Sequence, residues 1–255
     1  MQFLQVNNLN KSFVGVQALN DVSFSVDRNE IVSVIGPNGA GKTTLFNVIT
    51  KVFPATSGKV VFKGEDITGL KPHQVAERGI ARTFQHVRTL ADLTCLENVM
   101  TGCHRLSNTG LFESMLFLPK SRNEQQNARK KSLECLAVLG LDNIAAKLAG
   151  DLPYGTQKLL ELSRALVSDP ELLLLDEPVA ALNDTERDNM SQFLCKLKEM
   201  GKTCVLVEHQ MEFVMKCSDR IIVLNYGNKL AEGTPAEIQH NPEVIAAYLG
   251  GKQGA

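Results

Sequence analysis

The sequence predicts an α/β fold in which a mostly parallel sheet carries a phosphate-binding loop beside an antiparallel β subdomain. The apolar run Ile31 to Ile35 ends at a glycine-rich loop. The runs Leu172 to Leu175 and Cys204 to Val207 are equally apolar, as expected for strands covered on both faces. Near the N-terminus, Phe3 to Leu9 and the strictly alternating Val22 to Val26 predict half-buried antiparallel strands.

Composition predicts a soluble globular protein. The chain has 255 residues, 44% of them hydrophobic, which is enough to bury a full core. Its 27 basic and 28 acidic residues balance, so net charge gives no reason to expect nucleic acid as a partner. No apolar run reaches the ~20 residues that span a bilayer, and Met1 to Gln5 lacks signal-peptide features, so we expect the chain to stay inside the cell. Its 6 cysteines include no Cys-x2-Cys pair, which indicates reduced, mostly buried thiols.

The most specific motif follows the first apolar run. Gly36-Pro-Asn-Gly-Ala-Gly-Lys-Thr-Thr44 matches the Walker A pattern Gly-x4-Gly-Lys-Thr. Its glycines let backbone N–H groups close around an anion, Lys42 can reach the β- and γ-phosphates, and the Thr43 hydroxyl can bind Mg²⁺. A helix beginning near Lys42 adds its positive end. The motif predicts a P-loop NTPase core that binds ATP or GTP. The residues expected to hold the nucleotide are Gly36, Asn38, Gly39, Ala40, Gly41, Lys42, Thr43 and Thr44.

A second motif brings two acids to the end of a buried strand. In Leu172-Leu-Leu-Leu-Asp-Glu-Pro178 the carboxylates follow four leucines, and ligands of open α/β sheets bind at the carboxyl ends of the strands. We expect Asp176 to bind Mg²⁺, directly or through water. Glu177 is placed to polarise an attacking water.

The segment between these motifs predicts an inserted helical subdomain. Ala128 to Leu139 has helical periodicity, with leucines on one face. Arg105 to Arg122 is irregular and predicts a loop with a short amphipathic helix. Beyond the core, Ile221 to Leu224 and Lys229 to Glu232 predict strands around a tight turn, and Pro242 to Leu249 predicts a final helix.

Four weaker features follow one another in an informative order. They are Gln85 after a predicted strand, Leu152-Pro-Tyr-Gly-Thr-Gln157 before a helix, Ala180 to Asn183, and His209. Together with the Walker A loop and the acids, they resemble the ATP-binding-cassette (ABC) ATPases over nearly the whole chain. The resemblance implies a single nucleotide-binding domain over 1–255, with a core of 1–90 and 160–255 and a helical subdomain over about 91–159.

The resemblance also implies a mechanism. Two cassettes pair head to tail, and each MgATP lies between the Walker A loop of one and the signature of the other. The signature is Leu152 to Gln157 here, and Gly155 and Gln157 are its residues expected to bind the nucleotide. Gln85 contacts Mg²⁺ and the γ-phosphate, and His209 contacts the γ-phosphate, so both join Glu177 as catalytic residues. Phe13 matches the aromatic that stacks on adenine, although an aromatic there would also suit a sheet edge.

The signature departs from the common Leu-Ser-Gly-Gly-Gln at Pro153, Tyr154 and Thr156. This variant resembles the ATPases of high-affinity branched-chain amino-acid importers, as do Asn183 and the insertion at 105–122, whereas Ala181 stands where that subfamily usually has glycine. The resemblance implies a peripheral ATPase on the cytoplasmic face of the inner (plasma) membrane. Its partners would be two integral-membrane permeases, a non-identical second ATPase or a second copy, and indirectly an external solute-binding protein.

Other functions remain open on the sequence alone. ATPases for urea or amide uptake share much of this pattern, and the ATPase of lipopolysaccharide export is also similar. A non-transport cassette ATPase usually carries two cassettes or a long coiled coil, and this chain has neither. A P-loop kinase would leave the signature and His209 unexplained.

Overall fold

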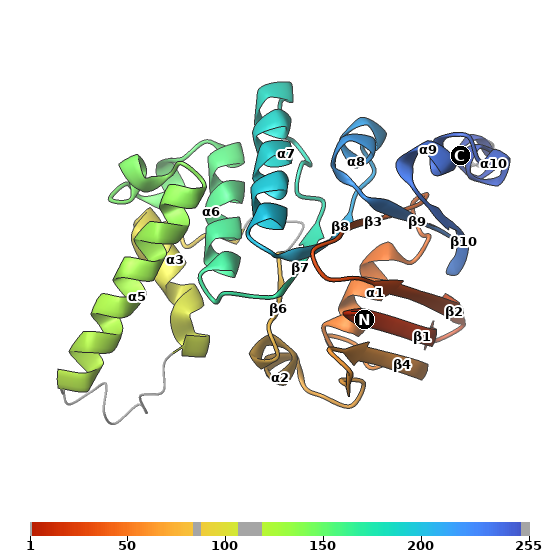
Figure 1. Ribbon diagram of the computed structural model, residues 1–255, viewed down its shortest axis with the longest axis horizontal. Coiled ribbons are helices and arrows are strands. Elements are labelled where there is room, and N and C mark those ends of the chain that lie inside the picture. The colour runs from red at the N-terminus through yellow and green to blue at the C-terminus, as the bar shows by residue number, and fades with distance from the viewer. Residues whose placement is uncertain (1, 84–87, 107–118, 251–255) are drawn as a thin grey trace. The chain divides into compact units, whose positions relative to one another are not determined.

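The computed structural model describes residues 2–83, 88–106 and 119–250, and Figure 1 shows its elements in chain order. Its contacts divide the chain into two compact units, one formed by Met1–Arg82 with Glu171–Ala255 and the other by Thr83–Pro170. The second unit extends beyond both boundaries expected from the sequence. Helix α6 (Tyr154–Leu166) runs without a break across the expected boundary at 159/160, so a division there would cut a continuous helix.

A six-stranded sheet forms the centre of the first unit, in the order β10-β9-β3-β8-β7-β6. Its strands are β3 (Ile31–Ile35), β6 (Ile80–Arg82), β7 (Leu172–Asp176), β8 (Thr203–Val207), β9 (Arg220–Asn225) and β10 (Asn228–Gly233). All neighbours are parallel except β9 and β10, which form a hairpin. This pairing confirms the predicted, mostly parallel sheet. Every residue of β3, β7 and β8 is buried, as predicted for strands covered on both faces.

The second sheet is antiparallel where its pairing is described, in the order β2-β1-β4-β5. Its strands are β1 (Leu4–Phe13), β2 (Val16–Val26), β4 (Ser57–Phe62) and β5 (Glu65–Asp66). The first two are longer than the sequence pattern predicted. Their register shifts between Val6 and Leu9, and Asn8 has a φ of 46°, so the alternation of buried and exposed residues breaks inside the hairpin.

The two faces of the six-stranded sheet pack against different elements. Val32 and Val34 of β3 join a core shared with the second sheet and with helix α1 (Lys42–Ile49). Ile35 joins the opposite cluster, which includes residues of the C-terminal helices. Because successive side chains of β3 enter the two opposite clusters, both faces of the strand are packed, and the end of the strand that leads into the next loop is held in place. The other helices of this unit are α2 (Pro72–Glu77), α7 (Asp184–Glu199), α8 (Met211–Cys217), α9 (Pro235–Gln239) and α10 (Pro242–Gly250).

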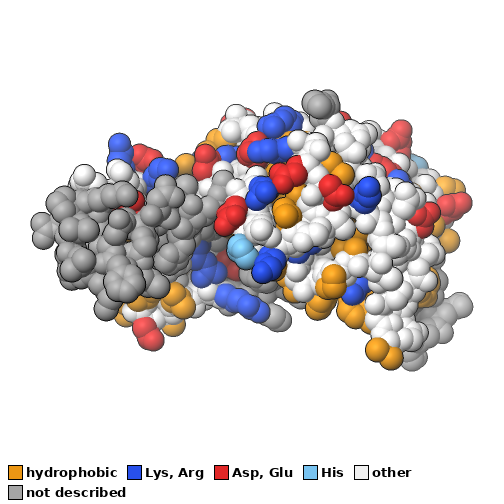
Figure 2. Space-filling model, turned by 90° about the horizontal axis from the view of Figure 1, so that it is seen from below, with side chains coloured by type: hydrophobic (Ala, Val, Ile, Leu, Met, Phe, Trp, Pro, Cys, Tyr) orange, Lys and Arg blue, Asp and Glu red, His pale blue; other side chains and the backbone are white. Residues whose placement is uncertain are grey.

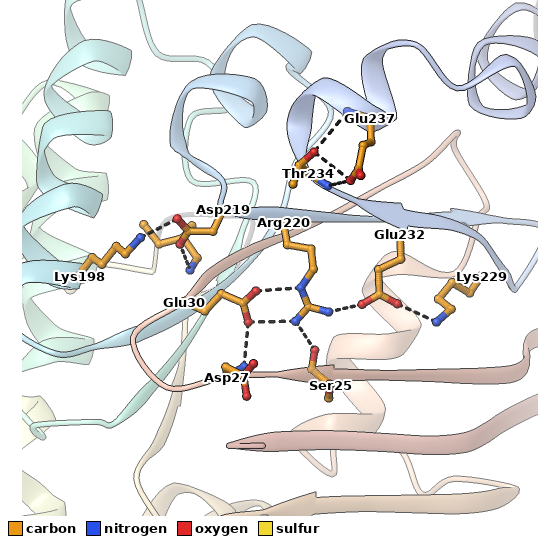
Figure 3. Close-up of polar contacts among 11 residues, drawn as sticks. Ser25, Asp27, Glu30, Lys198, Asp219, Arg220, Lys229, Glu232, Thr234 and Glu237 are labelled. Carbon is orange, nitrogen blue, oxygen red and sulfur yellow. Dashed lines mark hydrogen bonds and ion pairs between the residues drawn. The ribbon is translucent and has the colours of Figure 1, made fainter. Parts of the chain in front are cut away.

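Arg220, at the start of β9, links the six-stranded sheet to β2 of the second sheet, as the close-up in Figure 3 shows. Its Nε and Nη2 donate to the two carboxylate oxygens of Glu30 at 2.8 and 2.9 Å. The same guanidinium bonds Glu232 of β10 and the carbonyl oxygen of Ser25 in β2. Such a forked arrangement uses the planar geometry of arginine, which lysine cannot reproduce.

The second unit is helical. Its elements are α3 (Cys95–Met100), η1 (Thr101–Leu106), α5 (Pro119–Val138), η2 (Asp142–Ile144), η3 (Ala149–Asp151) and α6. A separate apolar cluster that includes Leu136 and Leu160 holds these helices together. The sequence pattern predicted a loop at Pro119 to Arg122, but these residues form the first turn of α5. Proline is well tolerated in the first turn of a helix, so it does not prevent the helix from beginning there. The rest of that expected loop, at 107–118, lies outside the described residues.

Two sequence-based expectations concern the surface and the thiols. On the face in Figure 2, acidic and basic side chains are interspersed. All six cysteines lie in described segments and are free thiols, four of them buried. Within 2–83, 88–106 and 119–250, no helix is long and apolar enough to cross a membrane.

Candidate nucleotide-binding and hydrolysis site

The predicted phosphate loop joins β3 to α1. Two of its glycines lie so close to neighbouring strands that no other residue would fit. Gly36 has a φ of 151°, and a Cβ there would lie 2.1 Å from the carbonyl oxygen of Leu224 in β9. Gly41 has a φ of 101°, and a Cβ there would lie 2.5 Å from the carbonyl oxygen of Ala18 in β2. Both approaches are too close for any side chain, so only glycine lets the loop lie against these strands.

The remaining loop residues occupy the tip of the loop and the start of the helix. Asn38 and Gly39 are exposed, and Ala40 is buried. Thr43 and Thr44 lie in the first turn of α1, where Thr43 is exposed. The backbone N–H groups of this turn and the Thr43 hydroxyl are therefore available to a ligand at the N-terminal end of the helix.

The Lys42 side chain folds back over the loop. Its Nζ donates hydrogen bonds to the carbonyl oxygens of Gly36 at 2.8 Å and Pro37 at 3.0 Å. Burial lowers the pKa of this ammonium group, while the negative charges of Glu177 and Asp176 act in the opposite direction. Both carboxylates therefore lie close enough to Lys42 to affect its amine, so the phosphate loop and the acidic strand end are near each other.

Asp176 forms a buried ion pair that the sequence analysis missed. Arg82 Nη2 lies 2.9 Å from Asp176 Oδ2, and the two side chains are 8% and 4% exposed. The same guanidinium donates to Asn47 Oδ1 of α1 at 2.7 Å. In the sequence, the signal for this pair was a charged residue, Arg82, in a short predicted strand. The pairing of β6 with β7, which makes Arg82 a neighbour of Asp176, depends on the fold.

Glu177 and His209 follow neighbouring parallel strands and approach each other. His209 Nδ1 lies 3.8 Å from Glu177 Oε1, and their side chains are 53% and 21% exposed. The Glu177 backbone N–H donates to the carbonyl oxygen of Val207 at 2.8 Å. Glu177 has a φ of 49°, in the left-handed region that non-glycine residues rarely adopt. The structure thus brings together a carboxylate and an imidazole that are 32 positions apart in the numbering of the chain.

The segment after Glu177 contains Ala180 to Asn183, one of the weaker features that the sequence analysis identified. Ala181 has a φ of 62°, a conformation that glycine adopts more easily than alanine. Asn183 caps helix α7, because its Oδ1 accepts from the Glu186 N–H at 2.9 Å while a Glu186 carboxylate oxygen accepts from the Asn183 N–H at 3.0 Å. The Asn183 side chain therefore has a structural role in this conformation.

Phe13 ends β1 with a partly exposed ring. Its side chain packs edge-to-face on Phe53, with ring centroids 5.4 Å apart, and Lys11 Nζ lies 4.8 Å from the Phe13 ring centroid. The residue is 41% exposed. The ring is thus supported on one side by an aromatic neighbour and remains accessible to a planar ligand.

Two further predicted nucleotide-binding residues, Gly155 and Gln157, lie in α6 of the second unit. Pro153 is the N-cap residue of this helix, and it makes no side-chain capping hydrogen bond. Gln157 Nε2 donates to the carbonyl oxygen of Leu152 at 2.9 Å, so its amide stabilises the turn that precedes the helix. Gln85, predicted to be catalytic and to bind metal, lies outside the described residues.

Comparison with known proteins identifies the family. The sequence model of ABC transporters matches residues 19–180, and a model described as branched-chain amino acid ATP-binding cassette transporter matches residues 228–253. The chain is 44% identical to the high-affinity branched-chain amino acid transport ATP-binding protein LivG of Salmonella typhimurium and 42% identical to BraF of Pseudomonas aeruginosa. Both alignments cover 97% of this chain and 97% of the relative.

Solved structures agree with these relatives. A nucleotide-free ATP-binding cassette from an ABC transporter superimposes with a TM-score of 0.86 and 32% identity, covering 97% of this chain and 99% of that chain. A dimeric cassette in a post-hydrolysis state with ADP and Pi has a TM-score of 0.77 and 28% identity, with 91% and 99% covered. The chain therefore belongs to the ABC transporter family, as an ATP-binding and ATP-hydrolysing subunit.

Proposed function

We propose that this chain drives the import of branched-chain amino acids by binding and hydrolysing ATP. The observation that carries the chemistry is the 3.8 Å approach of His209 Nδ1 to Glu177 Oε1, in the site where the acids act on Lys42. The solute class rests on relatives named as branched-chain amino acid transport proteins, which align over 97% of this chain. The C-terminal match at residues 228–253 supports the same class.

The phosphate loop holds the triphosphate in this proposal. Lys42 exchanges its hydrogen bonds to the loop carbonyls for the β- and γ-phosphates, and the N–H groups at the start of α1 surround them. The adenine stacks on the accessible ring of Phe13, which Phe53 supports from the edge.

A magnesium ion fits the donors beside the loop. Thr43 offers a hydroxyl and Asp176 a carboxylate, both hard oxygen donors of the kind that Mg²⁺ prefers. Mg²⁺ usually completes such sites with substrate phosphates and water, and the bound ion would neutralise charge on the phosphates. Gln85 is proposed as a further ligand, from outside the described residues.

Glu177 is the proposed general base and His209 the proposed γ-phosphate contact. Both side chains are partly exposed, so a water and a phosphate can reach them. The carboxylate would polarise the attacking water, and the imidazole would hold the γ-phosphate in line. Gln85 would respond to the same phosphate.

A head-to-tail dimer completes the site in this proposal. The first N–H groups of α6 have no side-chain cap, and free N–H groups at a helix N-terminus attract anions. The helix start, with Gly155 and Gln157, would therefore bind the γ-phosphate of ATP held by a partner cassette. We infer that the partner is a second, non-identical ATPase, with a second copy of this chain as the alternative.

The transport role places the dimer on the cytoplasmic face of the inner (plasma) membrane, as a peripheral part of a complex with two permeases. An external binding protein would recognise the solute. Leu90, which is 47% exposed, offers an apolar contact for a permease near the start of the helical unit.

Substituting the proposed base tests the ATPase chemistry. Glu177→Gln should retain ATP and stop hydrolysis, whereas Lys42→Ala should abolish turnover by weakening phosphate binding. Glu199→Gln, at an exposed position of α7, is the matched control and should hydrolyse ATP normally. Radiolabelled ATP distinguishes retention from turnover, and a wild-type rate in Glu177→Gln would rule Glu177 out as the base.

Copurification tests the transport role. The tagged full chain, isolated from its own cells in mild detergent, should bring two multi-span permeases and a cassette ATPase, which mass spectrometry would identify. Recovery of ribosomes, DNA-repair proteins or a lipopolysaccharide-export complex in their place would contradict import. Leu90→Asp should reduce permease recovery without changing the fold.

A further inference from the structure

Glu208 precedes His209 and is fully buried, with 0% of the residue exposed. We propose that Glu208 is a positioning residue for hydrolysis, whose carboxylate fastens the segment that carries Glu177 to the segment that carries His209. This inference rests on the proposed function, since the roles of Glu177 and His209 come from it.

The two carboxylate oxygens of Glu208 accept hydrogen bonds from two different segments. Oε1 accepts from the backbone N–H of Val179 at 3.0 Å. Oε2 accepts from the backbone N–H groups of His209 at 2.9 Å and Gln210 at 3.3 Å. Val179 lies two residues after Glu177, so one buried carboxylate binds the backbone beside both proposed catalytic side chains.

Further hydrogen bonds connect the same two segments. Gln210 Nε2 donates to the carbonyl oxygen of Val179 at 3.5 Å, so both backbone groups of Val179 bond to residues that follow β8. The Glu208 N–H itself donates to the carbonyl oxygen of Val34 at 3.4 Å, in the strand that leads to the phosphate loop. Glu208 therefore connects the segments that carry Glu177 and His209 to β3, the strand that precedes the phosphate loop.

The arrangement needs a carboxylate in particular. Charged oxygens accept stronger hydrogen bonds than neutral ones, and a buried N–H group left unpaired is unfavourable. Glutamine has the same size, but its amide has one accepting oxygen and an NH₂ group that can only donate. In Glu208→Gln, that NH₂ group would face the N–H of Val179 or those of His209 and Gln210, so one of the two segments would be released.

The consequence for catalysis follows from the geometry of Glu177. Its φ of 49° persists only where the surrounding structure holds it. Releasing Val179, two residues away, lets the Glu177 carboxylate shift relative to the imidazole now 3.8 Å from it. The phosphate loop is untouched, so the substitution should affect turnover much more than ATP binding.

The test measures kinetics and hydrogen exchange on the tagged full chain isolated together with its partner cassette, because a dimer completes the proposed site. In Glu208→Gln, kcat should fall at least about tenfold while KM for ATP changes less than about twofold, because positioning is lost and binding is kept. Exchange mass spectrometry should find faster amide exchange in the peptides containing Val179 and His209, with no change in α1. Glu212→Gln, an exposed acid in the first turn of α8, makes the same chemical change nearby and should leave both readouts at wild-type values.

Three outcomes would overturn the inference. They are a wild-type kcat in Glu208→Gln, a lower kcat with unchanged exchange in both peptides, and faster exchange throughout β3 and α1, which would mark a general loss of stability. The hydrogen-exchange readout needs no hydrolysis, so it tests the link between the segments even if the proposed ATPase chemistry fails. A normal Glu208→Gln enzyme beside an inactive Glu177→Gln enzyme would remove this inference and leave the proposed function intact.

Discussion

At the scale of single residues, Lys51 is poorly suited to its position at the end of α1. Its φ of 61° lies in the left-handed region, and the residue is only 7% exposed. Its Nζ is buried without a hydrogen-bond partner in the segments that the structure describes. Burial lowers the pKa of the ammonium group to about 8, although the charge of Asp66 acts in the opposite direction. The folded protein therefore carries a poorly solvated charge at neutral pH.

Removing that charge should stabilise the protein in a pH-dependent way. The folded-state pKa of about 8 lies below the ordinary value of 10.5, so the destabilisation is fully present below pH 8 and disappears as the pH rises past 10.5. Lys51→Met keeps an apolar stem and should raise the free energy of unfolding by about 1 kcal/mol at pH 7, and by less at pH 10. Urea unfolding at both pH values measures the difference. Lys59→Met, at an exposed position of β4, is the control, and a pH-independent gain would contradict the argument.

At the scale of secondary-structure elements, Arg82 connects three of them. It belongs to β6, pairs with Asp176 at the end of β7, and donates to Asn47 of α1 at 2.7 Å and to Thr50, which caps the end of α1, at 3.3 Å. The Arg82 side chain is only 8% exposed, so its hydrogen bonds are largely shielded from water and from salt. The ion pair therefore fixes the acidic strand end against the helix that follows the phosphate loop.

Breaking this pair should be much more harmful than breaking a surface pair. Arg82→Met leaves the buried Asp176 charge without this guanidinium and should lower the free energy of unfolding by about 3 kcal/mol in urea titrations. Arg78→Met removes the ion pair with Glu65, whose partners are 35% and 49% exposed, and should change stability little. Equal losses in the two variants would mean that Arg82 contributes as an ordinary surface arginine.

The elements also show which features a sequence can predict. Strands β3, β7 and β8 were predicted because burial on both faces leaves a continuous apolar run. The phosphate loop was predicted because its chemistry needs a fixed spacing within nine residues. Arg82 and Glu208 were missed because their partners, Asp176 and Val179, are 94 and 29 residues away. Such pairings depend on strand order, which local periodicity does not encode.

At the scale of the whole molecule, the proposed function depends on residues in separate units. The phosphate loop, Glu177 and His209 belong to the first unit, whereas the signature begins α6 in the second. In the proposed dimer, α6 acts on ATP bound by the partner subunit. The strength of that contact then depends on the N-cap position, where Pro153 offers neither a hydroxyl nor an N–H group.

Replacing Pro153 tests whether α6 contacts the partner's phosphate. Pro153→Ser should stabilise α6 by about 1 kcal/mol relative to Pro153→Ala, because serine can cap the helix and alanine cannot. If α6 meets the γ-phosphate, then in a Glu177→Gln background the serine variant should also dimerise at a lower ATP concentration than the alanine variant, because its hydroxyl can donate to the phosphate. Thermal unfolding measures the first effect and light scattering during ATP titration the second. A serine variant that gains stability yet dimerises like the alanine variant would place α6 away from the nucleotide.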